Sequence, residues 1–339
     1  MHNDVMMRYL WDLPGQFEYG LAGREALPNI GEGVQNIVIT GMGGSAIGGD
    51  ILRSLAAKEA RVPVVVNRGY EIPRFVGPQT LFLAVTYSGN TEETLSSFEQ
   101  ARKQGAQIVC LTSGGQLKEL AGYHDYPCLM VPGGLSPRAA TGYLFAPLAL
   151  LLEKNGLIQG VTEDLQETVD VLYRLRDQLN PEAPLAGNPA REAARLMKGA
   201  LPVIWGSTGL SETVAFRWKA QINENAKSPA YWAVLPELNH NEIMGFDEPR
   251  DIIKQLCLII LRDTGDHPRV LRRIEITKDL VKDKVKNLLE VQSSGRSWLA
   301  RFYSLVYIGD YASTYLALGY GKDPVAIEAI NHLKAELAK

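Results

Sequence analysis

The sequence predicts an α/β fold built from two parallel sheets, each with helices on both faces as an αβα sandwich. Short β-branched runs alternate with stretches of helical spacing through residues 36–131, and the same alternation restarts at Leu201. The chain has 339 residues, which exceeds the roughly 250–300 residues at which one hydrophobic core stops growing. We therefore expect two domains of related architecture.

The first half is expected to contain five strands. A helix should run from the glycine-rich turn after residue 40 to about residue 57, and another over 92–104, whereas the opening segment before residue 36 is expected to be irregular. The expected strands lie at residues 36–40, 62–66, 81–85, 107–111 and 128–131.

The second half should repeat this scheme after a charged helix over 162–180 that Pro181 ends. Strands are expected at 201–205, 231–235 and 255–261, and helices at 211–227, 280–291 and 301–318. We expect an N-terminal domain at residues 1–155, a helical connector at 156–195 and a C-terminal domain at 196–339.

Composition excludes several kinds of ligand and location. A net charge of −3 with dispersed Lys and Arg provides no basic surface for nucleic acid, and no apolar run approaches the length of a membrane span. Cys110, Cys128 and Cys257 lack metal-ligand spacing and lie in or beside apolar runs. We expect reduced thiols, a cytoplasmic protein and a small-molecule ligand.

Gly41–Ala46 has the form G-x-G-x-x-A between a strand and a helix, which first suggests a dinucleotide site. Such a site needs an acidic residue at the end of the next strand, where this chain has Asn67 and Arg68. A phosphate or sugar pocket with Ser45 at the helix start fits the residues better. A close strand-to-helix turn without a ligand is the alternative.

The loop Thr86–Thr91 is a more specific signal for an anion. Thr86, Ser88 and Thr91 supply three hydroxyls after an apolar strand, and the loop opens a helix whose free N–H groups can also bind a phosphate. Thr91 could instead serve only as the helix N-cap. Capping alone would explain one hydroxyl, not three.

Three side chains are candidates for catalytic roles. Glu224 lies in the last turn of a predicted helix, where the negative end of the helix dipole strengthens a carboxylate as a base. His240 stands in a polar loop between two apolar strands, and imidazole carries protons at neutral pH. Arg138 follows a strand and a rigid loop, so it could stabilise an enediolate or form a surface ion pair.

Together these segments resemble the bifunctional phosphoglucose/phosphomannose isomerases of the sugar isomerase (SIS) domain superfamily. The resemblance implies two SIS domains, each with a five-stranded parallel sheet, in a homodimer whose active site lies near the subunit boundary. It implies no metal and no cofactor. The motifs that carry it occur in order from about residue 36 to the carboxyl end: Gly41–Ala46, Thr86–Thr94, Pro137–Ala139, Asn223–Glu224 and Leu238–Glu242.

The resemblance also implies roles for individual residues. Glu224 would move a proton between C1 and C2, Arg138 would stabilise the cis-enediolate, and His240 of the other subunit would assist ring opening. A lysine near the carboxyl end belongs to the family site, and Lys334 is its match here. The residues that would bind the substrate, mainly through its phosphate, are Gly44, Ser45, Thr86, Ser88 and Thr91.

One segment departs from the family pattern. The family has Asp-Pro-Thr near its carboxyl end, and that threonine is associated with accepting both sugar epimers, whereas this chain reads Asp323-Pro324-Val325. The expected activity is interconversion of fructose 6-phosphate with glucose 6-phosphate and mannose 6-phosphate, and Val325 bears on the mannose reaction. The alternatives are isomerisation of another phosphosugar and a non-catalytic SIS module that senses a sugar phosphate.

Overall fold

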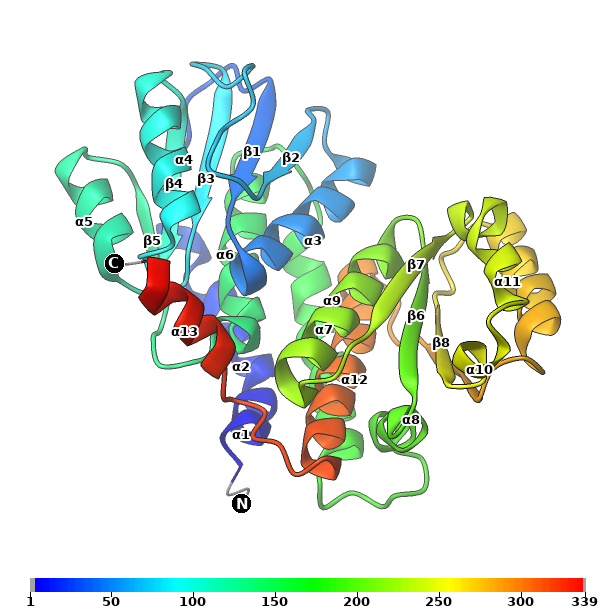
Figure 1. The fold of residues 1–339 in the computed structure, drawn as a ribbon. Coiled ribbons are helices and arrows are strands. Elements are labelled where there is room, and N and C mark those ends of the chain that lie inside the picture. The colour runs from blue at the N-terminus through cyan, green and yellow to red at the C-terminus, as the bar shows by residue number, and fades with distance from the viewer. Residues whose placement is uncertain (1–3, 338–339) are drawn as a thin grey trace. The chain divides into compact units, whose positions relative to one another are not determined.

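The structure, a computed structural model, describes residues 4–337, and it divides into two compact units. The N-terminal unit consists of Asp12–Asp170 with Ser297–Ala300, and the C-terminal unit of the chain up to Trp11, Val171–Arg296 and the chain from Arg301. Each unit contains one parallel sheet (Figure 1). The outer ends of the predicted domains, 1–3 and 338–339, lie outside the described residues, and the predicted domain limits stay predictions.

The N-terminal unit has a five-stranded sheet in the order β2-β1-β3-β4-β5 with all neighbours parallel. Alternate residues of the strands face opposite helical layers. Val38 and Phe82 pack in a core with Phe98 of α4 and Leu117 of α5, while Ile39 contacts α3 at Gly49 on the other face. The elements are α2 (Leu13–Ala22), η1 (Arg24–Ala26), β1 (Asn36–Thr40), α3 (Gly43–Glu59), β2 (Val64–Asn67), β3 (Thr80–Val85), α4 (Glu92–Lys103), β4 (Gln107–Thr112), α5 (Gly115–Tyr123), β5 (Cys128–Met130), η2 (Pro137–Ala139) and α6 (Thr141–Lys154).

The C-terminal unit has a parallel sheet in the order β7-β6-β8-β9, so its described residues form one strand fewer than the five that the family resemblance implies. Its elements are α1 (Val5–Trp11), α8 (Pro189–Met197), β6 (Leu201–Ser207), α9 (Leu210–Ala226), β7 (Tyr231–Leu235), η3 (Glu237–His240), η4 (Glu242–Phe246), α10 (Arg250–Ile253), β8 (Leu256–Arg262), α11 (Pro268–Val281), β9 (Asn287–Gln292) and α13 (Glu328–Leu337). α7 (Val161–Leu179) and α12 (Trp298–Gly319) contribute residues to both units.

The helices of this unit cover opposite faces of its sheet. β6 connects to β7 through α9, and β8 connects to β9 through α11, in the opposite direction across the sheet. Because crossovers between parallel strands are right-handed, α9 and α11 lie on different faces. On the α11 face, Trp205 of β6 packs in a core with Leu238 of η3, Phe246 of η4 and Ile274 of α11. The segment η3–η4 therefore lies on the face opposite α9.

The predicted α/β fold with two parallel sheets is confirmed, but the helix predicted at 280–291 is wrong. α11 ends at Val281, and β9 occupies Asn287–Gln292. β9 pairs with β8 from Cys257↔Asn287 to Arg262↔Gln292. Tertiary pairing gives these backbone groups partners that local helical spacing cannot reveal.

The prediction of an irregular opening segment is also wrong. α1 and α2 occupy Val5–Trp11 and Leu13–Ala22. Met6, Met7, Leu10, Leu13 and Phe17 are all buried, a three-to-four-residue spacing that is typical of an amphipathic helix. Pro14 and Gly15, which mark turns elsewhere, are tolerated here because the helix begins at Leu13.

The three thiols are free, and two of them are buried, as expected, while Cys128 is half-buried. Burial raises the pKa of Cys257 to about 12 and raises the pKa of Cys110 further, so both thiols stay protonated near neutral pH. None of the helices within residues 4–337 combines the length and apolarity needed to cross a membrane.

Candidate active site

Two predicted ligand loops meet at one edge of the N-terminal sheet. β1 lies between β2 and β3, so the connections that leave β1 and β3 diverge at their carboxyl ends. In open α/β sheets such a switch point forms the crevice where ligands bind. Gly41–Gly44 follows β1 and Thr86–Thr91 follows β3, which places both loops at this crevice.

Hydrogen bonds join the two loops and order their hydroxyls. Ser45, in the first turn of α3, is buried, and its Oγ accepts a bond from the Tyr87 N–H at 3.1 Å. The Oγ1 atoms of Thr86 and Thr91 lie 2.8 Å apart. Ser88 is exposed, and its Oγ accepts a bond from the Asn90 N–H at 3.3 Å. The loop is therefore already ordered around its three hydroxyls.

Thr91 stands at the N-cap position of α4, yet its side chain makes no capping hydrogen bond to that helix. Its hydroxyl is bonded to Thr86 instead. Capping therefore does not account for this threonine, and its role in binding substrate stays a prediction.

Arg138 lies next to the same loops. A Cβ atom on Gly44 would lie 2.6 Å from the carbonyl oxygen of Pro137, so only glycine lets η2 approach the start of α3. The Arg138 side chain is 4% exposed, which excludes the alternative of a surface ion pair. The N-terminal unit thus brings together Gly44, Ser45, Thr86, Ser88, Thr91 and Arg138.

Sequence reasoning missed two supports of this cluster. Tyr87 is buried, and its hydroxyl donates to the Pro132 carbonyl at 2.8 Å and accepts from the Leu135 N–H at 3.1 Å, which ties the loop after β3 to the loop after β5. Ser113 donates to the Tyr87 carbonyl from its N–H at 3.0 Å and from its Oγ at 2.6 Å. Thr112-Ser113-Gly114-Gly115, a turn sequence after a buried strand, was the available signal.

Glu224 lies in the last turn of α9, as predicted, and is half-buried. A buried network beside it fixes the rotation of this helix. Arg217, Gln221 and Asn225 are spaced four residues apart and therefore share one face of α9. Glu224 directly precedes Asn225 in the helix, so the rotation that the buried face fixes also sets the direction of the Glu224 side chain.

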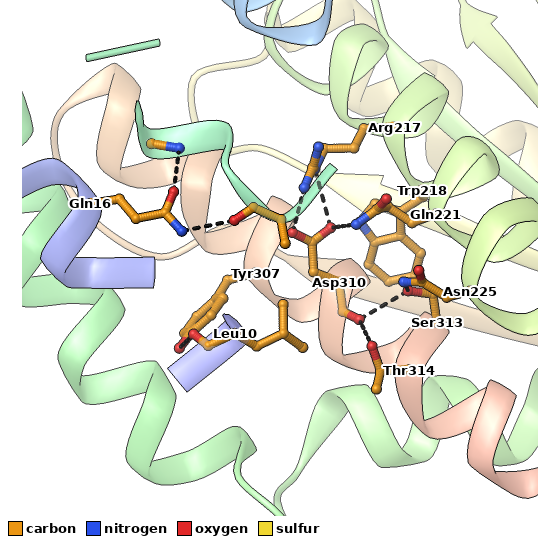
Figure 2. Close-up of polar contacts among 12 residues, drawn as sticks. Leu10, Gln16, Arg217, Trp218, Gln221, Asn225, Tyr307, Asp310, Ser313 and Thr314 are labelled. Carbon is orange, nitrogen blue, oxygen red and sulfur yellow. Dashed lines mark hydrogen bonds and ion pairs between the residues drawn. The ribbon is translucent and has the colours of Figure 1, made fainter. Parts of the chain in front are cut away.

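Figure 2 shows this network. Asp310 of α12 accepts bonds from Arg217 Nε at 3.2 Å and Nη2 at 2.7 Å, and from Gln221 Nε2 at 2.9 Å. Ser313 Oγ donates to the Asp310 carbonyl and accepts from Asn225 Nδ2, both at 2.9 Å. Because the Arg217 and Asp310 side chains are only 2% and 3% exposed, their charges stabilise each other inside the core.

The segment that departs from the family pattern lies at the carboxyl end of α9. Lys227 caps that helix in the left-handed conformation, and its Nζ donates to the carbonyl oxygens of Asn225 and Asp323. The Val325 N–H donates to Asp323 Oδ1 at 2.8 Å. Val325 is therefore held near the helix turn that carries Glu224.

His240 is the last residue of η3 and is exposed. Its neighbours are anchored on both sides. Asn239 donates to Thr277 Oγ1 at 2.8 Å and accepts from Arg273 Nη1 at 3.3 Å, which fixes it to α11. Glu242 Oε1 accepts from Trp205 Nε1 at 2.9 Å. Burial raises the pKa of Glu242, so this carboxyl is less readily ionised than an exposed one.

One chain does not bring Glu224 and His240 together. Glu224 is on α9, and His240 is in η3 on the opposite face of the four-stranded sheet. Lys334 lies on α13, which has no buried residue, and its side chain is exposed. Within residues 4–337, no group of three His, Cys, Asp or Glu side chains is arranged to hold a metal ion.

Comparisons with known proteins agree with this fold. A family model of the SIS domain matches residues 33–127, and a model described as the bacterial phospho-glucose isomerase C-terminal SIS domain matches residues 186–337. The C-terminal domain of glucosamine-fructose-6-phosphate aminotransferase from Francisella tularensis superposes with a TM-score of 0.75 and 16% identity, covering 96% of this chain and 99% of that one. At this identity the likeness shows the fold alone.

Two curated relatives are similar over nearly the whole chain. The bifunctional phosphoglucose/phosphomannose isomerase of Caldicellulosiruptor bescii is 45% identical over 336 residues, which is 98% of this chain and 99% of that protein. The protein of the same name from Aquifex aeolicus is 37% identical over 325 residues, 96% and 95% of the two chains. On this evidence the chain belongs to the family of bifunctional phosphoglucose/phosphomannose isomerases.

Proposed function

We propose that this protein is an aldose–ketose isomerase that interconverts fructose 6-phosphate with glucose 6-phosphate and with mannose 6-phosphate. Family membership supports the reaction class. The single structural observation that carries the proposal is the ordered hydroxyl loop Thr86–Thr91 beside Ser45 and the buried Arg138 at the sheet's switch point. Such a site suits a phosphorylated sugar.

In this mechanism Ser45, Thr86, Ser88 and Thr91 bind the phosphate and orient the open-chain sugar. The Glu224 carboxylate removes a proton from C1 of the ketose, and the electron pair of that C–H bond forms a C1–C2 double bond while the negative charge moves to O2, which gives a cis-enediolate. The O1 proton then passes to O2, and the same carboxyl returns its proton to C2, so that C1 becomes the carbonyl of the aldose.

The remaining groups stabilise negative charge and assist ring opening. The Arg138 guanidinium stabilises negative charge on the enediolate oxygens, and His240 transfers a proton during ring opening. Gly44 lets the backbone approach the substrate closely, and Lys334 adds a positive charge to the site. Glucose 6-phosphate and mannose 6-phosphate differ only at C2, a centre that is planar in the enediol, so one site can serve both.

We infer that the working form is a homodimer whose sites take residues from both subunits. Glu224 and His240 of one chain are separated by the sheet, because α9 and η3 lie on its opposite faces. A site that needs both groups is completed most simply when a second copy supplies His240.

We place the activity in the cytoplasm, at the hexose-phosphate step shared by glycolysis and gluconeogenesis. The protonated thiols of Cys110 and Cys257 suit a reducing compartment. Phosphorylated hexoses carry charge that retains them inside the cell, and an enediol isomerase works in either direction.

The test is a coupled assay without added metal that offers fructose 6-phosphate and measures both aldose phosphates. Glu224→Gln should lower turnover by ~10² or more while phosphate affinity and fold persist, and it should stop solvent deuterium from entering C2. Glu192→Gln is the control, since Glu192 makes only an exposed ion pair with Arg195 on α8. If sugar phosphate binds without turnover in the wild type, the protein is a sensor instead of an enzyme.

A further inference from the structure

Gln16 of α2 is a buried amide that is bonded at both ends. It is 1% exposed, and its Oε1 accepts from the N–H groups of Gly142 at 3.0 Å and Tyr143 at 3.4 Å. Its Nε2 donates to the Ala139 carbonyl at 2.8 Å. Figure 2 shows bonds at both ends of the Gln16 amide.

The oxygen of this amide acts as a cap for α6. The first N–H groups of a helix have no partner within it, and the N-cap residue Ala140 has no side-chain oxygen to offer. Gln16 supplies the acceptor from another helix. A Cβ atom on Gly142 would lie 2.7 Å from the Cβ of Gln16, so the glycine makes room for this contact.

The nitrogen of the amide holds η2. Ala139, whose carbonyl accepts the bond, directly follows Arg138 in this short helix. η2 also contacts the start of α3, where Gly44 permits the close approach of Pro137. The Arg138 backbone is therefore held by contacts with both Gln16 and the turn that leads to Ser45.

We propose that Gln16 is a positioning residue for Arg138 in the isomerisation, an inference that rests on the proposed function. Both ends of its amide are bonded to backbone groups, so Gln16 acts through Arg138 and not on the substrate itself. It sets where the Arg138 guanidinium lies relative to the enediolate. Misplacing a catalytic group by about 1 Å can lower a rate by about 10², so loss of the Ala139 bond should reduce kcat more than it changes KM.

The experiment is a double-mutant cycle on kcat with Gln16→Met and Arg138→Ala. Methionine keeps the length of glutamine but forms none of its hydrogen bonds. We expect Gln16→Met to lower kcat by roughly 10-fold to 10² in the wild-type background, and by less than about 2-fold when Arg138 is already alanine.

Asn188→Leu is the matched control. Asn188 is also buried, accepts from a helix N–H at 3.0 Å (Arg191) and donates to a carbonyl at 3.2 Å (Leu179), but it belongs to α8 of the C-terminal unit. Its replacement should lower Tm similarly and leave kcat within about 2-fold. An equal kcat loss in this control would mean that the loss in Gln16→Met comes from lower stability and not from the position of Arg138.

Gln16→Glu keeps the test decisive if the methionine variant does not fold. An ionised carboxylate cannot donate to Ala139, whereas the protonated form can. The ratio of its kcat to that of the wild type should therefore rise as pH falls. A flat ratio, or equal kcat losses for Gln16→Met with and without Arg138, would overturn this inference alone. A wild type that forms no aldose phosphate would overturn the proposed function as well.

Discussion

Replacing Asp310 by asparagine should destabilise the C-terminal unit strongly. The Asp310 carboxylate accepts two bonds from Arg217 and one from Gln221. The substitution keeps the shape but removes the negative charge, while the Arg217 charge stays in the core at 2% exposure. Breaking a buried ion pair from one side costs about 3–5 kcal/mol, and we expect about 3 kcal/mol because asparagine retains one acceptor.

Differential scanning calorimetry measures this effect. For a unit of about 150–250 residues, 1 kcal/mol corresponds to roughly 2–4 °C, so the Tm should fall by about 6–12 °C. Ser313→Ala is the matched neutral control, since Ser313 takes part in the same network through two uncharged bonds, one accepted from Asn225 and one donated to the Asp310 carbonyl. It should cost about 1 kcal/mol. The paired change Arg217→Met with Asp310→Leu removes both charges and should recover most of the loss.

Two results would refute this reasoning about buried charge. A Tm loss for Asp310→Asn no larger than that for Ser313→Ala would mean that the charge contributes nothing beyond a hydrogen bond. A paired variant less stable than Asp310→Asn would mean that the ion pair itself, not its imbalance, stabilises the packing of α9 on α12.

Three further predictions concern the site. Ser88→Ala and Thr91→Ala should each weaken a phosphorylated substrate by roughly 1.5–3 kcal/mol in calorimetric titration, and an equal loss for an unphosphorylated inhibitor would indicate general damage to the loop. A chelator should leave turnover intact, because the Glu, His and Arg groups suffice for an enediol route; inactivation that zinc reverses would contradict this. Glu224→Gln and His240→Ala chains, each nearly inactive alone, should regain activity when mixed. No recovery despite proven subunit exchange would place both groups in one site of one chain.

The sequence predicted well those features that depend on neighbouring residues. Strand–turn–helix patterns located both loops at the carboxyl ends of β1 and β3, because Gly41–Gly44 and Thr86–Thr91 follow apolar runs directly. Parallel topology then requires the two loops to share an edge of the sheet. Glu224 in the last turn of a helix followed from the breaker Ser228-Pro229.

Features set by distant partners could not be predicted in this way. The segment 287–292 becomes a strand because β8 pairs with it, although its spacing also fits a helix. Gln16 and Ala139 are 123 residues apart, and Arg217 and Asp310 are 93 residues apart. No local pattern marks a glutamine as the cap of a helix that begins so far along the chain, so both buried networks appear only in the folded protein.

Each unit supports one of its proposed catalytic side chains with a buried network. In the N-terminal unit, Gln16 holds the backbone that carries Arg138, and in the C-terminal unit the Arg217–Asp310 pair holds the helix that carries Glu224. In both cases a bonded core group positions the element that carries the side chain. Catalytic geometry needs such support, because a carboxylate or guanidinium on an unsupported turn would sample many positions. His240 itself is exposed, and its support comes from the bonds of the neighbouring Asn239 to α11. That difference fits a residue that one subunit presents to another, where the rest of its surroundings would form only on assembly.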